Sequence, residues 1–405
     1  MRLPAAIIGL VLAGGFASAQ SAYDDVPVPL DPSSCGVAGA DWAQRARARS
    51  LTPQPGLPPM PHPDDNPPDT ARIELGRKLF FDRRLSINGT MSCAMCHVPE
   101  QAFANWELQT AVGVEGRSVK RNAPTLVNVG FLSPLFHDGR DVTLETQFIG
   151  PLVARNEMAN ASAGRVIAFL NDRAEYRALF DAAFGAPASL DRLGMALGAY
   201  QRTLVAGNSP FDRWYYGGEA AVLGDAAKRG FALFSGRAEC SACHLIGDDD
   251  ALFTDLAFHD TGYGRLRETA RQNPPATARV QVAPGVFHDV DFAKIASVSL
   301  DREADLGRYE VTEDPADRWL FRTPPLRNVA MTRPYMHDGA LTTLHDVLVF
   351  YNQGGAGHPD QDPRIRPLGL SDSDLADLEA FLHSLTSSGL DCLAVEARIH
   401  PPDNY

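Results

Sequence analysis

The chain has 405 residues and a formal net charge of −13 at pH 7. This length allows two domains of ordinary size, each large enough to bury a core. The acidic balance and the lack of a basic patch in the sequence argue against nucleic acid as a partner. A basic protein partner would suit such a chain, although net charge indicates this only weakly.

The first 19 residues read as a secretory signal peptide (1–19). Arg2 provides the positive start, an apolar stretch follows, and Ala17-Ser18-Ala19 forms a small-residue cleavage site. We expect a mature chain that begins near Gln20 and is exported to the periplasm; the alternative is an uncleaved anchor. No later stretch is apolar over the ~18 residues that a spanning helix needs, so we predict no membrane span.

Residues 20–70 are rich in proline and predict an extended arm rather than a domain. Beyond the arm, the segment 371–389 begins with a capping box, Ser371 with Asp374, and ends on Gly389. No stretch shows the period-two alternation that is typical of a strand, so we predict an all-α fold. Helical spacing of apolar residues is found in 74–86, 162–184, 189–205, 228–239 and 371–389.

Two C-x-x-C-H motifs carry the strongest chemical signal. Each offers two thiols one helical turn apart, which can reach the two vinyl groups of a haem, and a histidine that can ligate the iron. A thioredoxin-like redox site would need a βαβ pattern, and a zinc site would not require a histidine directly after each pair. We therefore predict two covalently bound c-type haems. The residues involved are Cys93, Cys96, His97, Cys240, Cys243 and His244.

An internal repeat organises the chain beyond the arm. The stretch RNAPTLVNVGFLSPLFHDGRDVTLETQ (121–147) matches FRTPPLRNVAMTRPYMHDGALTTLHDV (321–347) at a constant offset of 200 residues. The C-x-x-C-H motifs repeat at an offset of 147, so the second copy carries about 53 additional residues. We predict two tandem cytochrome c-like domains, 71–222 and 223–395, the second with a surface insertion at about 247–305.

Two further cysteines, Cys35 and Cys392, lie near opposite ends of the chain. In an oxidising compartment two such cysteines often pair. The sequence leaves open whether they form a disulfide or remain two buried thiols.

One tyrosine has two possible roles. Leu344, Val347, Leu348 and Tyr351 recur at helical spacing and form one apolar stripe, which Gly354-Gly355 ends. Tyr351 therefore faces inward. From this pattern alone a core tyrosine is favoured over a ligand of iron.

Residues 70–390 resemble the bacterial dihaem cytochrome c peroxidases and their relative MauG. The resemblance rests on the repeated C-x-x-C-H motif and on RNAPTLVNV (121–129), GPLVARNEM (150–158) and LRNVAMTRPYMHDG (326–339). It implies an enzyme that uses hydrogen peroxide together with a redox partner protein. It also implies that the N-terminal haem reacts with peroxide and that the C-terminal haem transfers electrons.

The resemblance assigns roles around the first haem. His97 would be the proximal ligand, Glu157 the acid/base group and Gln147 a polar residue of the pocket. Cleavage of peroxide needs a proton taken from the near oxygen and given to the leaving one, which a carboxylate with a raised pKa can do. The alternative for Glu157 is an exposed carboxylate at a helix start. Val114 stands where the peroxidases usually carry a blocking histidine, so we expect an open site in the resting ferric state.

At the second haem, His244 would be the proximal ligand, and Tyr351 stands where the peroxidases place a methionine ligand. Met336 and Met331 are the fallback candidates, and a core tyrosine remains the alternative. Methionine is a soft thioether that raises a haem potential, whereas a tyrosinate is anionic and favours ferric and higher iron. This difference favours a MauG-like function over peroxide removal.

The resemblance also implies a calcium ion between the haems, held by the Asn122 side chain and the carbonyls of Thr332 and Pro334. Oxygen ligands suit calcium; the alternative is a simple Asn-x-Pro turn. His137 stands where the family has a tryptophan between the haems, either as part of an inter-haem path or as a structural residue. Trp106 is a possible substitute, although nothing in the sequence places it.

We therefore predict a periplasmic dihaem c oxidoreductase that uses hydrogen peroxide to oxidise a partner. The alternative within the family is a peroxidase that takes electrons from a small cytochrome or a cupredoxin. The alternative from another class is a non-enzymatic dihaem electron carrier or sensor. Two six-coordinate low-spin haems in the ferric protein would favour the carrier.

Overall fold

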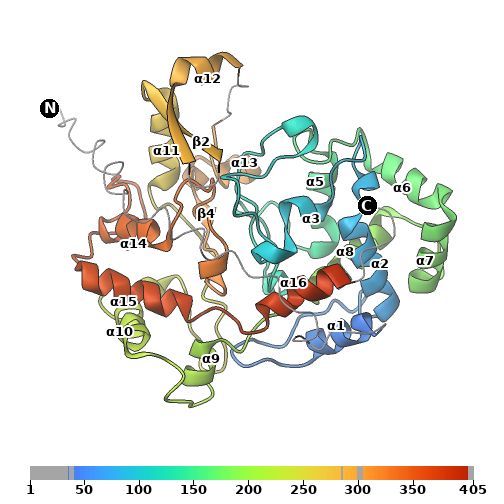
Figure 1. Cartoon of the computed structure of the whole chain (residues 1–405), viewed down its shortest axis with the longest axis horizontal. Coiled ribbons are helices and arrows are strands. Elements are labelled where there is room, and N and C mark those ends of the chain that lie inside the picture. The colour runs from blue at the N-terminus through green and yellow to red at the C-terminus, as the bar shows by residue number, and fades with distance from the viewer. Residues whose placement is uncertain (1–34, 36–40, 284–285, 299–303, 400–405) are drawn as a thin grey trace. The chain divides into compact units, whose positions relative to one another are not determined.

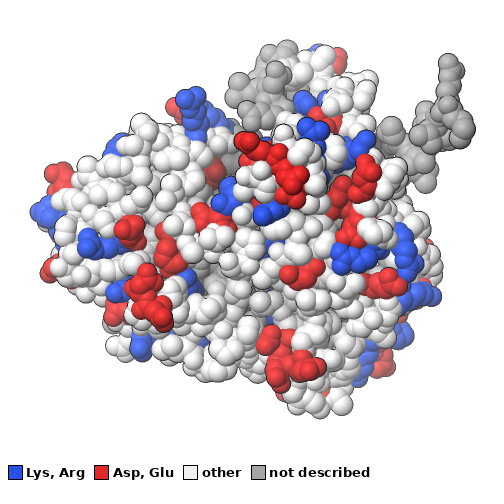
Figure 2. Space-filling model, turned by 180° about the vertical axis from the view of Figure 1, so that it is seen from behind, with Lys and Arg blue, Asp and Glu red and all other residues white. Residues whose placement is uncertain are grey.

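The computed structural model describes residue 35 and residues 41–283, 286–298 and 304–399. The predicted signal peptide, 1–19, lies outside these residues, as does most of 20–40. In the part of the chain that the structure describes, no helix combines the length and the apolar character that crossing a bilayer requires. On the face shown in Figure 2, acidic and basic side chains are interspersed among the described residues.

Helices dominate the described chain (Figure 1). The α-helices up to the second motif are α1 (Trp42–Leu51), α2 (Thr70–Phe81), α3 (Cys93–Cys96), α4 (Leu144–Gln147), α5 (Ile149–Val153), α6 (Ala163–Asp172), α7 (Ala174–Phe184), α8 (Leu190–Gln201), α9 (Pro210–Tyr215) and α10 (Asp225–Ser235). The later ones are α11 (Tyr263–Gln272), α12 (Phe292–Val298), α13 (Tyr309–Thr312), α14 (Leu344–Asn352), α15 (Asp372–His383) and α16 (Leu390–Ile399). Short 3-10 helices are η2 (Arg83–Leu85), η3 (Pro99–Gln101), η4 (Val114–Gly116), η5 (Val129–Phe131), η6 (Cys240–Ala242), η7 (Pro315–Asp317) and η8 (Val329–Met331).

The helix predictions agree with these bounds in outline. The capping box of Ser371 and Asp374 is present and starts α15. The predicted helix 162–184 is two helices, because Arg173 adopts an extended conformation (φ −99°, ψ 124°) between α6 and α7.

The prediction that the chain has no strands was wrong. Strands β2 (Thr277–Ala283) and β3 (Val286–Asp291) form an antiparallel pair. Val280 and Val282 do alternate with polar neighbours in β2, but the run is short and was not recognised. Two further strands of two residues each, β1 (Phe258–His259) and β4 (Phe321–Arg322), also pair antiparallel.

The described residues fall into two compact units. The larger contains 31–266 and 305–405 and holds both C-x-x-C-H motifs. The described part of the smaller unit comes from 267–304, within the insertion expected at about 247–305, and contains the β2–β3 hairpin followed by α12.

Two close helix crossings in the larger unit correspond to each other, one beside each motif. Gly76 of α2 lies against the backbone of Ala196 in α8, and a Cβ at Gly76 would overlap the Ala196 carbonyl oxygen. Gly230 of α10 lies in the same way against Asp377 of α15. Only glycine permits such an approach of two backbones. The helix that precedes each motif is thereby held against a later helix of the same half.

The repeat seen in the sequence reappears as matching local geometry. Asn128 and Asn328 both adopt the left-handed conformation, with φ of 65° and 60°. The side-chain oxygen of Asn128 accepts a hydrogen bond from the backbone N–H of Ala206 at 2.9 Å. That of Asn328 accepts one from Ser387 at 2.8 Å. Equivalent residues therefore anchor the equivalent loop in both halves.

The larger unit holds two main apolar cores. The first packs Phe80, Phe103 and Tyr200 around α2 and α8. The second packs Phe253 and Phe381 around α10 and α15. Each core therefore lies beside one C-x-x-C-H motif.

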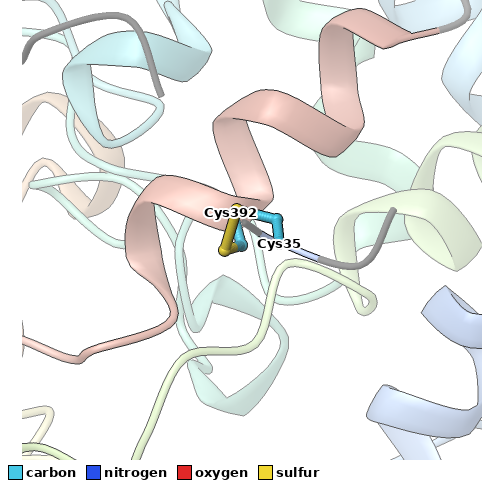
Figure 3. The surroundings of a disulfide bond; sticks show 2 residues. All are labelled: Cys35 and Cys392. Atoms are coloured by element: carbon cyan, nitrogen blue, oxygen red, sulfur yellow. A yellow bond between two sulfur atoms is a disulfide. The ribbon is translucent and has the colours of Figure 1, made fainter. Parts of the chain in front are cut away.

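The last helix, α16, returns to the first core. Its residues Leu390 and Leu393 are buried there. Cys392 of the same helix is bonded to Cys35 in a disulfide (Figure 3). The structure thus favours the disulfide over two buried thiols. A bridge across such a separation in sequence typically stabilises a fold by about 2–4 kcal/mol.

Candidate haem sites

The first motif forms a single turn of helix, α3, which places Cys93 and Cys96 on the same side. Neither cysteine takes part in a disulfide. Burial raises the pKa of both thiols to about 12, and the nearby Glu157 carboxylate adds to this. The thiols are therefore protonated at neutral pH, and both are available for attachment to one ligand.

A backbone carbonyl fixes the orientation of each motif histidine. His97 Nδ1 lies 3.0 Å from the carbonyl oxygen of Pro124 and 3.2 Å from that of Phe103. Carbonyl oxygens only accept, so Nδ1 carries the hydrogen and Nε2 keeps its lone pair for a metal. Burial lowers the pKa of His97, which keeps the ring neutral.

The second motif repeats this arrangement. His244 Nδ1 donates to the carbonyl oxygen of Phe253 at 2.8 Å, and burial lowers the pKa of the ring. Phe103 and Phe253 are both in the left-handed conformation, with φ of 53° and 56°. The same strained loop residue therefore presents a carbonyl to each histidine. Burial also raises the pKa of the Cys240 thiol to about 12.

A cavity of about 580 Å³ opens beside His97. Its size lies within the range of cofactor pockets, and its wall combines apolar side chains with a few convergent polar groups. A thiol pair, an imidazole with a free Nε2 and an apolar cavity are together the donor set and the space that a c-type haem requires. The predicted site residues that line the cavity are Cys96, His97, Asn122, His137, Gln147 and Glu157.

Glu157 lies in the turn between α5 and α6, where it is partly buried. It is not at a helix start, so the structure does not support the alternative reading of this residue. Burial raises the pKa of its carboxyl group, and the positive charge of Arg140 opposes the rise. Gln147 is the last residue of α4. Two separate short segments thus bring these polar side chains to one cavity.

The loop that carries Val114 packs on the turn that carries Glu157. The backbone N–H of Val114 donates to the Glu157 carbonyl oxygen at 2.9 Å, and only 2% of the Val114 surface is exposed. The neighbouring Gly113 lies so close to Asn156 and Glu157 that a Cβ there would overlap their backbone. The side chain at position 114 offers no atom that could bind iron.

Tyr351 lies on α14 close to the second motif. Burial raises the pKa of its hydroxyl, and the proximity of Cys240 and Cys243 adds to the effect. The hydroxyl makes no hydrogen bond to any residue that the structure describes, and the ring packs edge-on against Phe350. A core tyrosine normally finds a hydrogen-bond partner for its hydroxyl.

The two fallback residues differ in their positions. Met331 packs against the first core. Met336 is the repeat partner of Phe136, a residue of the cavity wall, and has a left-handed backbone with φ of 69°.

His137 and His337 mark a junction between the two halves. The His137 carbonyl oxygen accepts a hydrogen bond from the Arg322 backbone N–H, and the His337 carbonyl oxygen accepts one from Asn122, both at 2.8 Å. The two halves thus exchange equivalent backbone bonds. The ring of His337 stacks on Phe321 with centroids 3.8 Å apart.

His137 is neutral at the cavity wall. Burial lowers its pKa to about 3, and the nearby positive charge of Arg121 contributes. Its Nε2 lies 3.1 Å from the Asn122 carbonyl oxygen and must donate to it. Trp106 lies outside the set of described residues that line the cavity and packs under the guanidinium of Arg333, 5.0 Å from the ring centroid.

The Asn122 side chain reaches across the junction to the second half. Its amide lies 2.6 Å from the Pro334 carbonyl oxygen, and the residue is 8% exposed. Amide oxygen and nitrogen are assigned from such contacts and exchange by a flip. Two of the three residues that were predicted to bind calcium are therefore adjacent. Thr332 lies two residues earlier in the chain.

Sequence reasoning missed a polar cluster beside the second motif. Cys243, Asp255 and His259 lie within 4.8 Å of one another, as metal ligands would. The His259 ring also contacts Asp255 and Asp362, each at 2.9 Å. Because Cys243 belongs to a haem-attachment motif, this cluster is part of the second haem site. No motif could have indicated it, since Asp362 lies over a hundred residues away.

A family model described as "Di-haem cytochrome c peroxidase" matches residues 70–220. The methylamine utilization protein MauG of Methylorubrum extorquens is 35% identical over 359 residues, 87% of this chain and 89% of the relative. This chain belongs to the di-haem cytochrome c peroxidase family. The family has two c-type haems, which the two motifs would attach, and its members are peroxidase-type oxidoreductases.

Two further members have comparable similarity. A cytochrome-c peroxidase of Denitromonas iodatirespirans is 37% identical over 337 residues, 82% of this chain and 85% of the relative. The crystal structure of a MauG-like protein associated with microbial copper homeostasis superposes with a TM-score of 0.66 at 33% identity. That comparison covers 84% of this chain and 96% of the solved one. A solved MauG-like protein thus has this fold.

Proposed function

We propose that this protein is a periplasmic MauG-like oxidoreductase, which uses hydrogen peroxide at the first haem site to oxidise a side chain of a partner protein. Family membership supports a peroxide-dependent oxidoreductase. The finer proposal depends on three residues of this chain, Val114, Glu157 and Tyr351. The periplasmic location depends on removal of the predicted signal peptide, 1–19.

The buried valine at position 114 carries the proposal. It stands where the peroxidases usually carry a blocking histidine, and its backbone is fixed to Glu157 by a hydrogen bond of 2.9 Å. A valine side chain has no lone pair, so position 114 would offer the iron of the first haem no ligand. Peroxide then has access without prior reduction of the second haem.

At the first site a ferric haem would supply the metal that binds and activates peroxide. Glu157 takes a proton from the near oxygen of peroxide and returns it to the leaving oxygen. Burial raises its pKa toward the range in which it can do both. Gln147, on the same cavity wall, can donate and accept hydrogen bonds and so orient the peroxide.

At the second site we propose that Tyr351, together with His244, would bind the haem iron. Its hydroxyl has no hydrogen-bond partner among the described residues and lies near the motif cysteines. A nearby ferric ion lowers the pKa of a phenol, because it stabilises the anion. A phenolate ligand favours oxidised iron, which suits the storage of an oxidising equivalent better than the uptake of electrons from a cytochrome.

We also propose a calcium ion at Asn122, with the carbonyl oxygens of Thr332 and Pro334. The adjacency of Asn122 and Pro334 supports this site. Calcium would require the Asn122 amide to turn its oxygen toward the ion. Such an ion would bridge the two halves at their junction.

The proposal is tested on the haem-loaded, fully ferric protein. EPR and absorption spectra are recorded before and after one equivalent of hydrogen peroxide. We expect one high-spin and one low-spin haem at rest, and oxidation by peroxide without prior reduction. Val114→His should slow this reaction until one haem is reduced, whereas the control Val114→Leu should not.

Three results would contradict the proposal. Two low-spin haems that do not react with peroxide would indicate an electron carrier. A reaction that starts only after one haem is reduced would indicate a reduction-gated peroxidase. Equal reaction rates in the Val114→His and Val114→Leu variants would show that position 114 does not face the peroxide site.

A further inference from the structure

A buried guanidinium at the cavity of the first haem site has no carboxylate partner among the residues that the structure describes. Arg322 belongs to β4, in the second half of the chain, but it lines the cavity beside His97. Only 8% of its surface is exposed. Its Nε donates to the Phe136 carbonyl oxygen at 3.0 Å, and one terminal nitrogen has a longer contact of 3.5 Å with the Thr323 carbonyl oxygen.

The other cations of the cavity wall are paired. Arg121 contacts Asp138 at 2.5 Å and Asp305 at 2.7 Å. Arg140 contacts Asp138 at 3.1 Å. Lys120 contacts Glu310 at 2.5 Å and is partly exposed. Arg322 forms no ion pair with any residue that the structure describes, and burial lowers its pKa to about 10. Among the described cations of this wall, Arg322 is therefore the one without a described counter-charge.

A buried charge without a partner is strongly unfavourable in a protein interior. The two carbonyl oxygens offset only part of this cost, because they are neutral dipoles and carry no negative charge. An anion in the adjoining cavity would complete the pair. A planar guanidinium suits a carboxylate best, because two of its N–H groups can bind the two carboxylate oxygens together.

The repeat supports a ligand-binding role for this position. Arg322 is the repeat partner of Asn122, and each donates its backbone N–H to the histidine carbonyl of the opposite half. Each also directs its side chain to a carbonyl of that half, Asn122 to Pro334 and Arg322 to Phe136. At equivalent positions of the repeat, the first half therefore has Asn122, a proposed calcium ligand, and the second half has Arg322, a fixed positive charge.

We propose that Arg322 binds a carboxylate of the cofactor, a haem propionate, in the first haem site and holds it ionised. The second half of the chain thereby sets the electrostatics of the first haem. The assignment requires a haem at the first motif, but it does not require partner oxidation. Arg322 is a positioning residue, since it acts on the iron through the propionate.

The pair has a defined effect on the reduction potential. A fixed positive charge near the haem favours the reduced iron, which carries one positive charge less than the oxidised form. Loss of the guanidinium lowers the potential and leaves a buried propionate without a partner. The pKa of that propionate then rises, because burial disfavours its charged form. The potential of the variant should become dependent on pH and should rise as pH falls.

The experiment is spectroelectrochemistry of the full-length, haem-loaded protein between pH 5.5 and 8, without peroxide or partner. Arg322→Gln is compared with Arg322→Lys and with the control Lys120→Gln, which removes one paired charge from the same wall. Pyridine haemochrome analysis confirms two haems in each preparation. Because neither peroxide nor partner is present, the result is independent of the proposed function.

We expect Arg322→Gln to shift the reduction equilibrium of the first haem at least tenfold toward the oxidised form at pH 8, which is 59 mV for one electron. Arg322→Lys keeps the positive charge, so its reduction equilibrium should stay close to that of the wild type. Lys120→Gln should shift the equilibrium only slightly. The pH slope should be confined to Arg322→Gln and to the first haem.

Equal shifts in Arg322→Gln and Lys120→Gln, or an unchanged pH profile, would overturn the assignment. A second measurement covers the case in which Arg322→Gln does not retain haem. The wild-type potential is then recorded at increasing phosphate and chloride concentrations. It should stay constant, because the propionate is covalently part of the cofactor. A dependence on added anion would show that Arg322 binds a free anion and would also overturn the proposal.

Discussion

Single backbone carbonyls determine the chemistry of the two motif histidines. The oxygens of Pro124 and Phe103 hold the hydrogen of His97 on Nδ1, and Phe253 does the same for His244. The free Nε2 of each ring is then the only nitrogen that can bind iron. The left-handed backbone of both phenylalanines is unfavourable for a bulky residue, so the packing around each loop must hold it in place.

Replacing Tyr351 by methionine tests the second axial ligand. A neutral thioether in place of a phenolate should raise the reduction potential of the second haem by at least about 59 mV. This corresponds to a tenfold shift of the reduction equilibrium toward the reduced form. Spectroelectrochemistry and the low-spin EPR signal measure the change. Tyr335→Phe is the matched control, because this tyrosine donates to the Val329 carbonyl oxygen and belongs to the second core. An unaltered second haem in Tyr351→Met would leave Tyr351 as a core residue.

Glu157 gives the peroxide reaction a defined pH dependence. The carboxylate is the form that accepts a proton, so the rate should fall as pH falls through its raised pKa. Glu157→Gln should lower the rate about 10²–10⁴-fold and remove this pH dependence. Stopped-flow absorption after mixing with peroxide measures both. A variant with the wild-type pH profile would exclude Glu157 as the acid/base group.

A short sequence motif predicts functional residues that act together with their neighbours in the sequence. Cys93, Cys96 and His97 follow from spacing alone, because one turn of helix positions all three. Arg322 could not be found in this way, since its significance depends on a cavity formed by the other half of the chain. The placement of Glu157 beside Val114 came from the resemblance, and only the fold shows the hydrogen bond between their backbones.

At the scale of elements, the crossing of α2 with α8 is a sensitive point. Gly76→Ala would press a methyl group into the Ala196 carbonyl, a backbone group that cannot turn away. We expect a loss of about 1–3 kcal/mol in the free energy of unfolding. Gly164→Ala in α6 is the control, because a Cβ there meets only the Ser162 Oγ at 3.8 Å. Denaturant unfolding of the haem-loaded proteins compares them, and equal midpoints would contradict the close crossing.

The periodicity of apolar residues predicts that a segment is helical better than it predicts where the helix begins and ends. The segment 162–184 reads as one helix because its apolar spacing continues across Arg173, where the backbone becomes extended. The β2–β3 hairpin was missed because its alternation spans few residues. The two-residue strands β1 and β4 have no sequence signal at all, although β4 positions Arg322.

In the larger unit, the two halves of the repeat are complementary rather than identical. Each contributes a buried core, a motif and a carbonyl-fixed histidine. The exchange of backbone bonds at His137 and His337 joins them beside Asn122 and Arg322, where their side chains differ. Position 122 is asparagine and position 322 is arginine, and position 351 has a tyrosine that we propose as a ligand of the second haem. A single substitution in one half can therefore change one haem and leave the other unchanged.

The bond between Cys35 and Cys392 turns most of the chain into a covalent ring that contains both motifs. A protease that cuts once inside the ring opens it but releases no fragment. Residues 271–277 are exposed and provide a natural place for such a cut. Protein nicked there should migrate as one band on a non-reducing gel and as two bands after reduction, and only the larger, N-terminal band should carry haem, because both motifs precede residue 271. Separation without reductant would show that the ring is not closed in solution.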